Sequence, residues 1–211
     1  MYCGARHLRS RRYDWTMYKG VSDIFSRYWR AYGGLSAVLR SPYFHAALVL
    51  LLLTFNTWFN PNWWDQSLNV LPSLLGFTLG GFAIFIGFGD ERFRALLAEP
   101  DDDTETPTIY VSLCSTFVHF ILVQVLALMY AVVAKSWWFY TPLIDFARPW
   151  LTYLNGVAGA IGYGLFLYAL TSVIAATMHV LRIAAMYEQH QRIRSAQATA
   201  QTPRPRETQQ S

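Results

Sequence analysis

Charged side chains are scarce in this chain. Only 14% of its 211 residues are Asp, Glu, Lys or Arg, whereas an ordinary soluble domain carries about 25%. Hydrophobic residues make up 54% of the chain and aromatic residues 17%. The scarcity is concentrated in four stretches without any charged residue: 41–64, 66–89, 106–134 and 149–181. Such stretches argue against a soluble enzyme and indicate a small multi-pass membrane protein.

Motifs that carry chemistry are also missing. The two cysteines, Cys3 and Cys114, are too far apart in the sequence to suggest a disulfide framework or a cysteine metal site. The sequence contains no HExxH, GxSxG, Walker A or dinucleotide-binding glycine pattern. Cys114 and His119 would lie about 140° apart around a helix, so they cannot work as a nucleophile and its base. We therefore expect no enzyme activity, no catalytic residue, no metal and no cofactor.

The uncharged stretches predict an all-α membrane protein with four transmembrane helices, because about 20 helical residues cross a hydrocarbon core. The first is the shortest and could be tilted or partly interfacial. Pro42 and Pro72 are expected at helix starts, where the missing N–H costs little. The predicted organisation is an N-terminal region over 1–40, a bundle over 41–181 and a C-terminal region over 182–211. The helices are expected near 43–60, 70–89, 108–133 and 153–181.

The distribution of basic residues predicts the orientation of the bundle. All of the 17 Lys and Arg residues except Lys135 and Arg148 fall in the two ends or the central loop. The positive-inside rule therefore places both termini in the cytoplasm, and we expect a bacterial inner (plasma) membrane. Most tryptophans fall on the opposite side, where we expect an aromatic belt at the outer interface. These tryptophans are Trp58, Trp63, Trp64, Trp137, Trp138 and Trp150.

The two ends of the chain have different characters. Residues 13–32 mix aromatic and charged residues and predict an amphipathic helix on the cytoplasmic leaflet, ended by Gly33 and Gly34. It could be a plain anchor or a gating or lipid-sensing collar. A short turn over Leu35–Arg40 would lead into the first span. Residues Leu181–Ala198 should continue the last span as a helix, and the tail from Thr202 should be disordered.

Two rows of small residues suggest close helix packing. Gly76 and Gly80 lie four residues apart in the second span. Gly156, Ala160 and Gly164 form a similar row in the fourth. Small residues let membrane helices approach closely, either within one bundle or between subunits.

Polar residues within the spans are the candidates for a functional path. On a helical wheel Ser112, Thr116 and His119 lie within about 60° of one another. Tyr168, Ser172 and His179 follow one face of the fourth span. If these faces meet, they could line a hydrated path with His119 as its titratable group. Alternatively, His119 bonds a neighbouring group and only packs the bundle.

These features favour a homo-oligomeric channel or pore-type membrane effector, controlled through its cytoplasmic elements. The first alternative is a non-conducting structural or accessory subunit of a larger membrane complex. A weaker alternative is a small-solute or proton transporter. Membrane lipids are the expected partners, a cytosolic protein is a further candidate, and nucleic acid is not expected. The acidic cluster from Glu99 to Glu105 lacks the glycine and distal glutamate of an EF-hand, so it predicts a solvated linker.

Overall fold

The computed structural model describes residues 11–87, 91–98, 107–137 and 148–201. Almost all of these residues are helical, and none of them forms a strand. The helices in chain order are α1 (Arg11–Tyr32), α2 (Gly34–Arg40), α3 (Pro42–Leu53), α4 (Phe55–Phe59), α5 (Trp63–Gly87), α6 (Glu91–Ala98), α7 (Ile109–Ser136) and α8 (Arg148–Gln201).

The structure confirms an all-helical chain with helices of membrane-spanning length. Three of them, α5, α7 and α8, are long and apolar enough to cross a membrane. A fourth span is present if α2 and α3, which meet at a 59° bend, are taken together. The predicted first span corresponds to α3 and α4. These two helices are separated at Thr54, whose hydroxyl donates a hydrogen bond to the Leu50 carbonyl at 2.7 Å.

Two local predictions need correction. Pro42 does begin α3, but Pro72 lies inside α5 rather than at its start. Helix α5 begins earlier, at Trp63, because Asn62 adopts a left-handed φ of 73° that ends the preceding turn. Residues 35–40 belong to helix α2 and not to a turn. The break before α2 is at Gly33 and Gly34, whose φ values of 99° and 66° are accessible to glycine at no steric cost.

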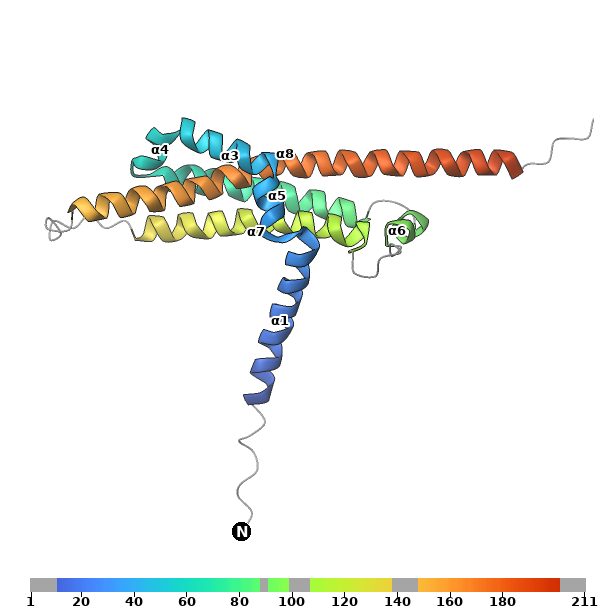
Figure 1. Cartoon of the computed structure of the whole chain (residues 1–211), viewed down its shortest axis with the longest axis horizontal. Helices are drawn as coiled ribbons and strands as arrows, with labels where there is room; N and C mark the ends of the chain where they lie inside the picture. Colours follow the sequence, from blue (N-terminus) through green and yellow to red (C-terminus); the bar gives the residue numbers. More distant parts are fainter. Residues whose placement is uncertain (1–10, 88–90, 99–106, 138–147, 202–211) are drawn as a thin grey trace, which may run out of the picture.

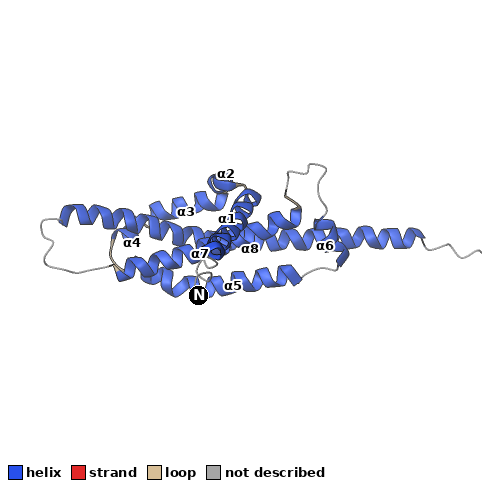
Figure 2. Cartoon of the chain, turned by 90° about the horizontal axis from the view of Figure 1, so that it is seen from below, coloured by secondary structure: helices blue, strands red, loops and turns tan. Residues whose placement is uncertain are grey.

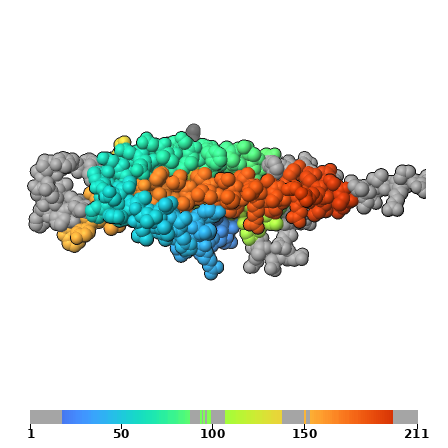
Figure 3. All heavy atoms as spheres, turned by 90° about the horizontal axis from the view of Figure 1, so that it is seen from above, coloured from blue at the N-terminus to red at the C-terminus, as the bar shows by residue number. Residues whose placement is uncertain are grey.

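The long helices α5, α7 and α8 run side by side, and α3 packs along α8 (Figure 1). In Figure 3, α8 lies between the α2–α3 segment and α5. Helix α8 continues well beyond the bundle, which confirms the predicted helical extension over 181–198. Helix α1 leaves the bundle steeply and contacts it mainly through α7 (Figures 1 and 2). The tail from Thr202 and the cluster over 99–105 lie outside the described residues.

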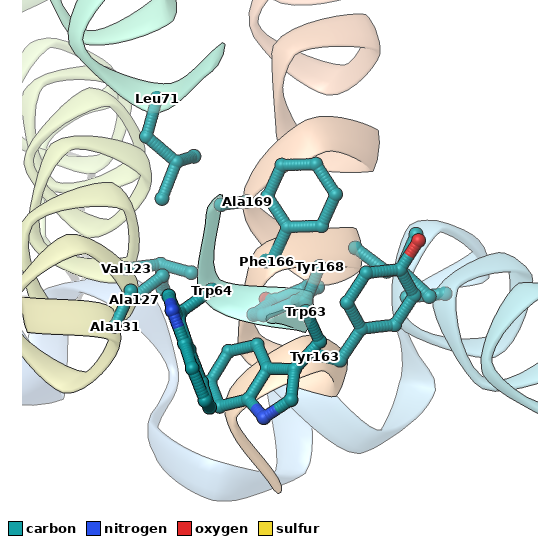
Figure 4. Close-up of a cluster of buried hydrophobic side chains, with 12 residues drawn as sticks. Trp63, Trp64, Leu71, Val123, Ala127, Ala131, Tyr163, Phe166, Tyr168 and Ala169 are labelled. Carbon is teal, nitrogen blue, oxygen red and sulfur yellow. The ribbon is translucent and has the colours of Figure 1, made fainter. Parts of the chain in front are cut away.

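The first core cluster lies where α3, α5, α7 and α8 meet (Figure 4). Trp63 and Trp64 are 5% and 4% exposed and pack against Ala131 and Tyr163 in this cluster, so they do not belong to a lipid-facing belt. Trp137 and Trp150 are 76% and 75% exposed, as a belt requires. Trp58 is partly buried and donates from Nε1 to the Leu51 carbonyl at 2.8 Å, and Trp138 lies outside the described residues.

A second core cluster lies towards the other end of the bundle, where α6 packs against α7 and α8. Phe93 of α6 and Tyr187 of α8 make an edge-to-face contact, with ring centroids 5.0 Å apart. Phe85 of α5 stacks on Phe117 of α7 at 5.6 Å. The chain therefore has two apolar clusters in series along the long helices.

Candidate functional site

His119 is the centre of a chain of side chains that joins three helices. The hydroxyl of Tyr28 in α1 lies 2.8 Å from its Nδ1, and the hydroxyl of Tyr168 in α8 lies 2.9 Å from its Nε2. The ring of Tyr32, also in α1, stacks on the imidazole with centroids 3.9 Å apart. Because a neutral imidazole has one N–H, one tyrosine donates to it and the other accepts from it. We call Tyr28, His119 and Tyr168 the tyrosine–histidine chain.

The C-terminal half of α1 carries the two aromatic residues that make this contact. Tyr28 and Tyr32 are four residues apart, so they share one face of the helix. Burial and the neighbouring Tyr32 raise the pKa of Tyr28 to about 12, which keeps its hydroxyl protonated at neutral pH. Burial also raises the pKa of Tyr32. The residues before Gly33 are therefore held against α7 by neutral hydrogen bonding and stacking.

A cavity of about 270 Å³ lies between the N-terminal half of α7 and helix α8, about one turn along α7 from His119. Ser112, Thr116, His179 and Arg182 line it. The Nδ1 of His179 lies 2.8 Å from the Ala175 carbonyl, which can only accept, so the hydrogen of a neutral ring is on Nδ1. Its Nε2 is then a hydrogen-bond acceptor.

The predicted polar faces of the third and fourth spans do meet, but they divide into two parts. Ser112, Thr116 and His179 line the cavity, whereas His119 and Tyr168 bond directly to each other about one turn further along α7. Ser172 is fully buried and donates to the Ala169 carbonyl at 2.6 Å. The six residues therefore do not line one open path within the described part of the chain.

One buried polar contact between α5 and α7 was not predicted from the sequence. Gln124 and Thr78 join α7 to α5 through a hydrogen bond of 2.9 Å, and both are almost completely buried. The Oε1 atom of Gln124 has no hydrogen-bond partner among the described residues. Gln124 points away from the Ser112 face by about 120°, so it does not belong to the predicted path.

The small residues of α8 pack within the chain. A side chain on Gly156 would touch Phe59, and one on Gly164 would touch Leu51. Ala160 is partly buried between them. The helices approach most closely at two further glycines of α8. A Cβ on Gly159 would overlap the Trp58 carbonyl, and a Cβ on Gly162 would overlap Trp63 and Tyr130.

Three glycines of α5 face away from the other helices of the bundle. A Cβ on Gly76, Gly80 or Gly87 would meet no atom within 4 Å. These glycines and the exposed Ala83 lie about 180° around α5 from its buried row of Ser67, Leu71, Thr78 and Phe85. We call Gly76, Gly80, Ala83 and Gly87 the small-residue face of α5.

Comparison with known protein families, curated proteins and solved structures finds no match. Over the described residues, no three His, Cys, Asp or Glu side chains come close enough together to hold a metal ion. The site is therefore defined by its own geometry.

Proposed function

We propose that this chain is a non-catalytic, self-associating membrane protein of the channel or pore-effector class, in which α1 controls the bundle. The observation that carries the proposal is the small-residue face of α5, which points away from the chain's own bundle. Lipid supplies no hydrophobic drive for helix association, so close backbone approach at small residues is the usual source of contact between membrane helices.

A polar residue supports the same face. Asn69 is exposed on α5, two helical turns before Gly76 and within about 20° of the small-residue face on the wheel. A side-chain amide exposed to lipid costs free energy unless it finds a hydrogen-bond partner. Where α5 helices from several subunits pack around one axis on this face, the Asn69 side chains could supply that partner to one another.

Helix α1 indicates where the cytoplasmic edge of the hydrocarbon lies. It crosses the bundle steeply at the level of His119 and carries Lys19, Asp23, Arg27 and Arg30. Charges at the centre of a bilayer cost about 2.5–3.5 kcal/mol each, so this helix belongs at the interface. We therefore infer that His119 lies at the edge of the hydrocarbon, not deep within it.

The length of α7 agrees with a hydrocarbon edge at His119. Helix α7 has 28 residues, so it is about 42 Å long, compared with about 30 Å of hydrocarbon. The part from His119 to Ser136 is about 26 Å long and matches the hydrocarbon alone. The remaining part of α7, with the second core cluster and α6, would then lie on the cytoplasmic side.

In this arrangement the tyrosine–histidine chain connects the interfacial helix to the innermost end of the polar cavity. Movement of α1 on the leaflet would pull on His119 and on Tyr168, and through them on the contact between α7 and α8. This coupling supports the interpretation of α1 as a controlling collar rather than a plain anchor.

Self-association is tested by the mass of the protein in nanodiscs, measured by native mass spectrometry. We expect a single closed oligomer larger than a dimer. Gly80→Leu should dissociate it, because a large side chain separates the two backbones. Ala46→Leu adds similar bulk to an exposed position on α3 and should leave the oligomer intact.

A monomeric wild-type protein, or equal loss of the oligomer in both variants, would contradict the proposal. The alternative, an accessory subunit that conducts nothing and binds other chains, would then be favoured.

A further inference from the structure

A cavity forms a wedge between α1 and the N-terminal half of α7. Its volume is about 670 Å³. Arg27 and Arg30 of α1 line it together with Val111, Cys114 and Val118 of α7. The wedge therefore combines two cations on one wall with apolar and thiol side chains on the other.

The ion pairs within 4.0 Å in the described part of the chain involve other residues than Arg27 and Arg30. Both arginines are exposed. A guanidinium offers a planar set of N–H donors that matches the oxygens of a phosphate group. The hydroxyl groups of Thr108 and Ser115 also line the wedge and can donate to phosphate oxygens.

The orientation of α1 places the wedge at the headgroup layer. Tyr18 and Phe25 are 75% and 56% exposed, and Tyr18 lies about 180° from Arg27 around the helix. Aromatic residues on one side and arginines on the other are typical of a helix lying in the interface. With the aromatic side turned into the leaflet, Arg27 and the wedge face the layer that contains the lipid phosphates.

We propose that the wedge between α1 and α7 binds the phosphate headgroup of an anionic membrane lipid through Arg27 and Arg30. This inference rests on the interfacial position of α1 but not on self-association, so either can fail without the other. A bound lipid would hold α1 against α7 beside the tyrosine–histidine chain. The content of anionic lipid in the leaflet would then affect the contact between α1 and the bundle.

Cys114 supplies a probe inside the wedge. In a Cys3→Ser protein it is the remaining thiol, and its rate of modification by N-ethylmaleimide can be followed by mass spectrometry. The full chain is placed in nanodiscs of phosphatidylcholine, with or without phosphatidylglycerol. We expect phosphatidylglycerol to slow modification about tenfold, since each basic residue near the surface contributes appreciably to anionic-lipid binding.

The variants distinguish lipid binding at the wedge from general electrostatic attraction of anionic lipid to the protein. Arg27→Gln with Arg30→Gln should abolish the protection, and Arg27→Lys should retain part of it. Lys19→Gln with Arg40→Gln removes the same charge outside the wedge and should keep the protection. Circular dichroism verifies that α1 stays helical in each variant.

Three results would overturn the proposal. Equal loss of protection in both double variants would indicate general surface attraction. Protection by millimolar inorganic phosphate in phosphatidylcholine discs would indicate a soluble anion instead of a lipid. A thiol that is unreactive without phosphatidylglycerol would show that the wedge is closed to its surroundings. The oligomer mass, measured on the same samples, reports separately on self-association.

Discussion

At the scale of single residues, the contacts of His119 decide how it can act. Both ring nitrogens have a tyrosine hydroxyl within 3 Å, and a third tyrosine covers the ring face. A histidine engaged in this way cannot line an open pore until one of those contacts breaks. The structure shows the packing alternative, and the same contacts connect α1 to the bundle.

Tyr28→Phe should loosen α1. The substitution removes one part-buried hydrogen bond, which is worth about 1 kcal/mol and corresponds to about fivefold faster amide hydrogen exchange in residues 18–32. His119→Leu removes both hydrogen bonds and should have a larger effect. Hydrogen exchange measured by mass spectrometry in nanodiscs tests this.

Tyr18→Phe is the matched control for that experiment, since Tyr18 is on the same helix and is 75% exposed. Its exchange rates should equal those of the unmodified chain. If Tyr28→Phe also leaves α1 unchanged, the tyrosine–histidine chain does not hold the helix.

At the scale of helices, the two rows of small residues serve different contacts. The α8 row faces Phe59 of α4 and Leu51 of α3, and at the neighbouring Gly162 the helices approach too closely for a Cβ. The α5 row has open space beside it. Similar spacing in the sequence therefore leads to packing inside the chain in one case and to an available surface in the other.

Gly162→Ala should destabilise the bundle by about 1–3 kcal/mol, because the added methyl group forces Trp63 and Tyr130 apart. Gly81→Ala is the matched control, since a Cβ there meets no atom within 4 Å and Gly81 lies off the small-residue face. The measurement is the unfolding free energy of each variant in detergent. Equal stability of the two variants would mean that the α8–α5 contact is looser than the structure shows.

At the scale of the whole molecule, the cavity between α7 and α8 and the tyrosine–histidine chain are arranged in series. The cavity contains Ser112, Thr116 and His179, and His119 with Tyr168 lies beyond its inner end. If the oligomer conducts, release of α1 should extend this cavity. The channel and accessory-subunit proposals then differ in a measurable flux.

Potassium efflux from liposomes should increase in Tyr28→Phe relative to the unmodified chain. Adding Thr116→Leu should reduce that efflux about tenfold, because the larger apolar side chain fills the cavity and removes a polar lining group. Thr116→Val keeps the size of the side chain and should conduct more than Thr116→Leu. Absence of efflux from both the unmodified chain and Tyr28→Phe would exclude a potassium channel.

The sequence alone determined the helical architecture, because long uncharged stretches allow little else. It also located most helix boundaries within a few residues. The start of α5 lies earlier than predicted, because the uncharged stretch 66–89 leaves out Asp65 and the residues before it. In the structure this carboxylate lies in the first turn and pairs with Lys135 at 2.9 Å, where the helix dipole also favours it.

Only the tertiary structure decided which polar residues meet. A helical wheel gives the face of a residue but not the helix opposite, so His119 could be placed on a polar face but not between Tyr28 and Tyr168. The same limit applies to the glycines, whose spacing is alike in α5 and α8. Their roles depend on whether another helix occupies the space beside them, and that is a property of the packed bundle rather than of either sequence segment.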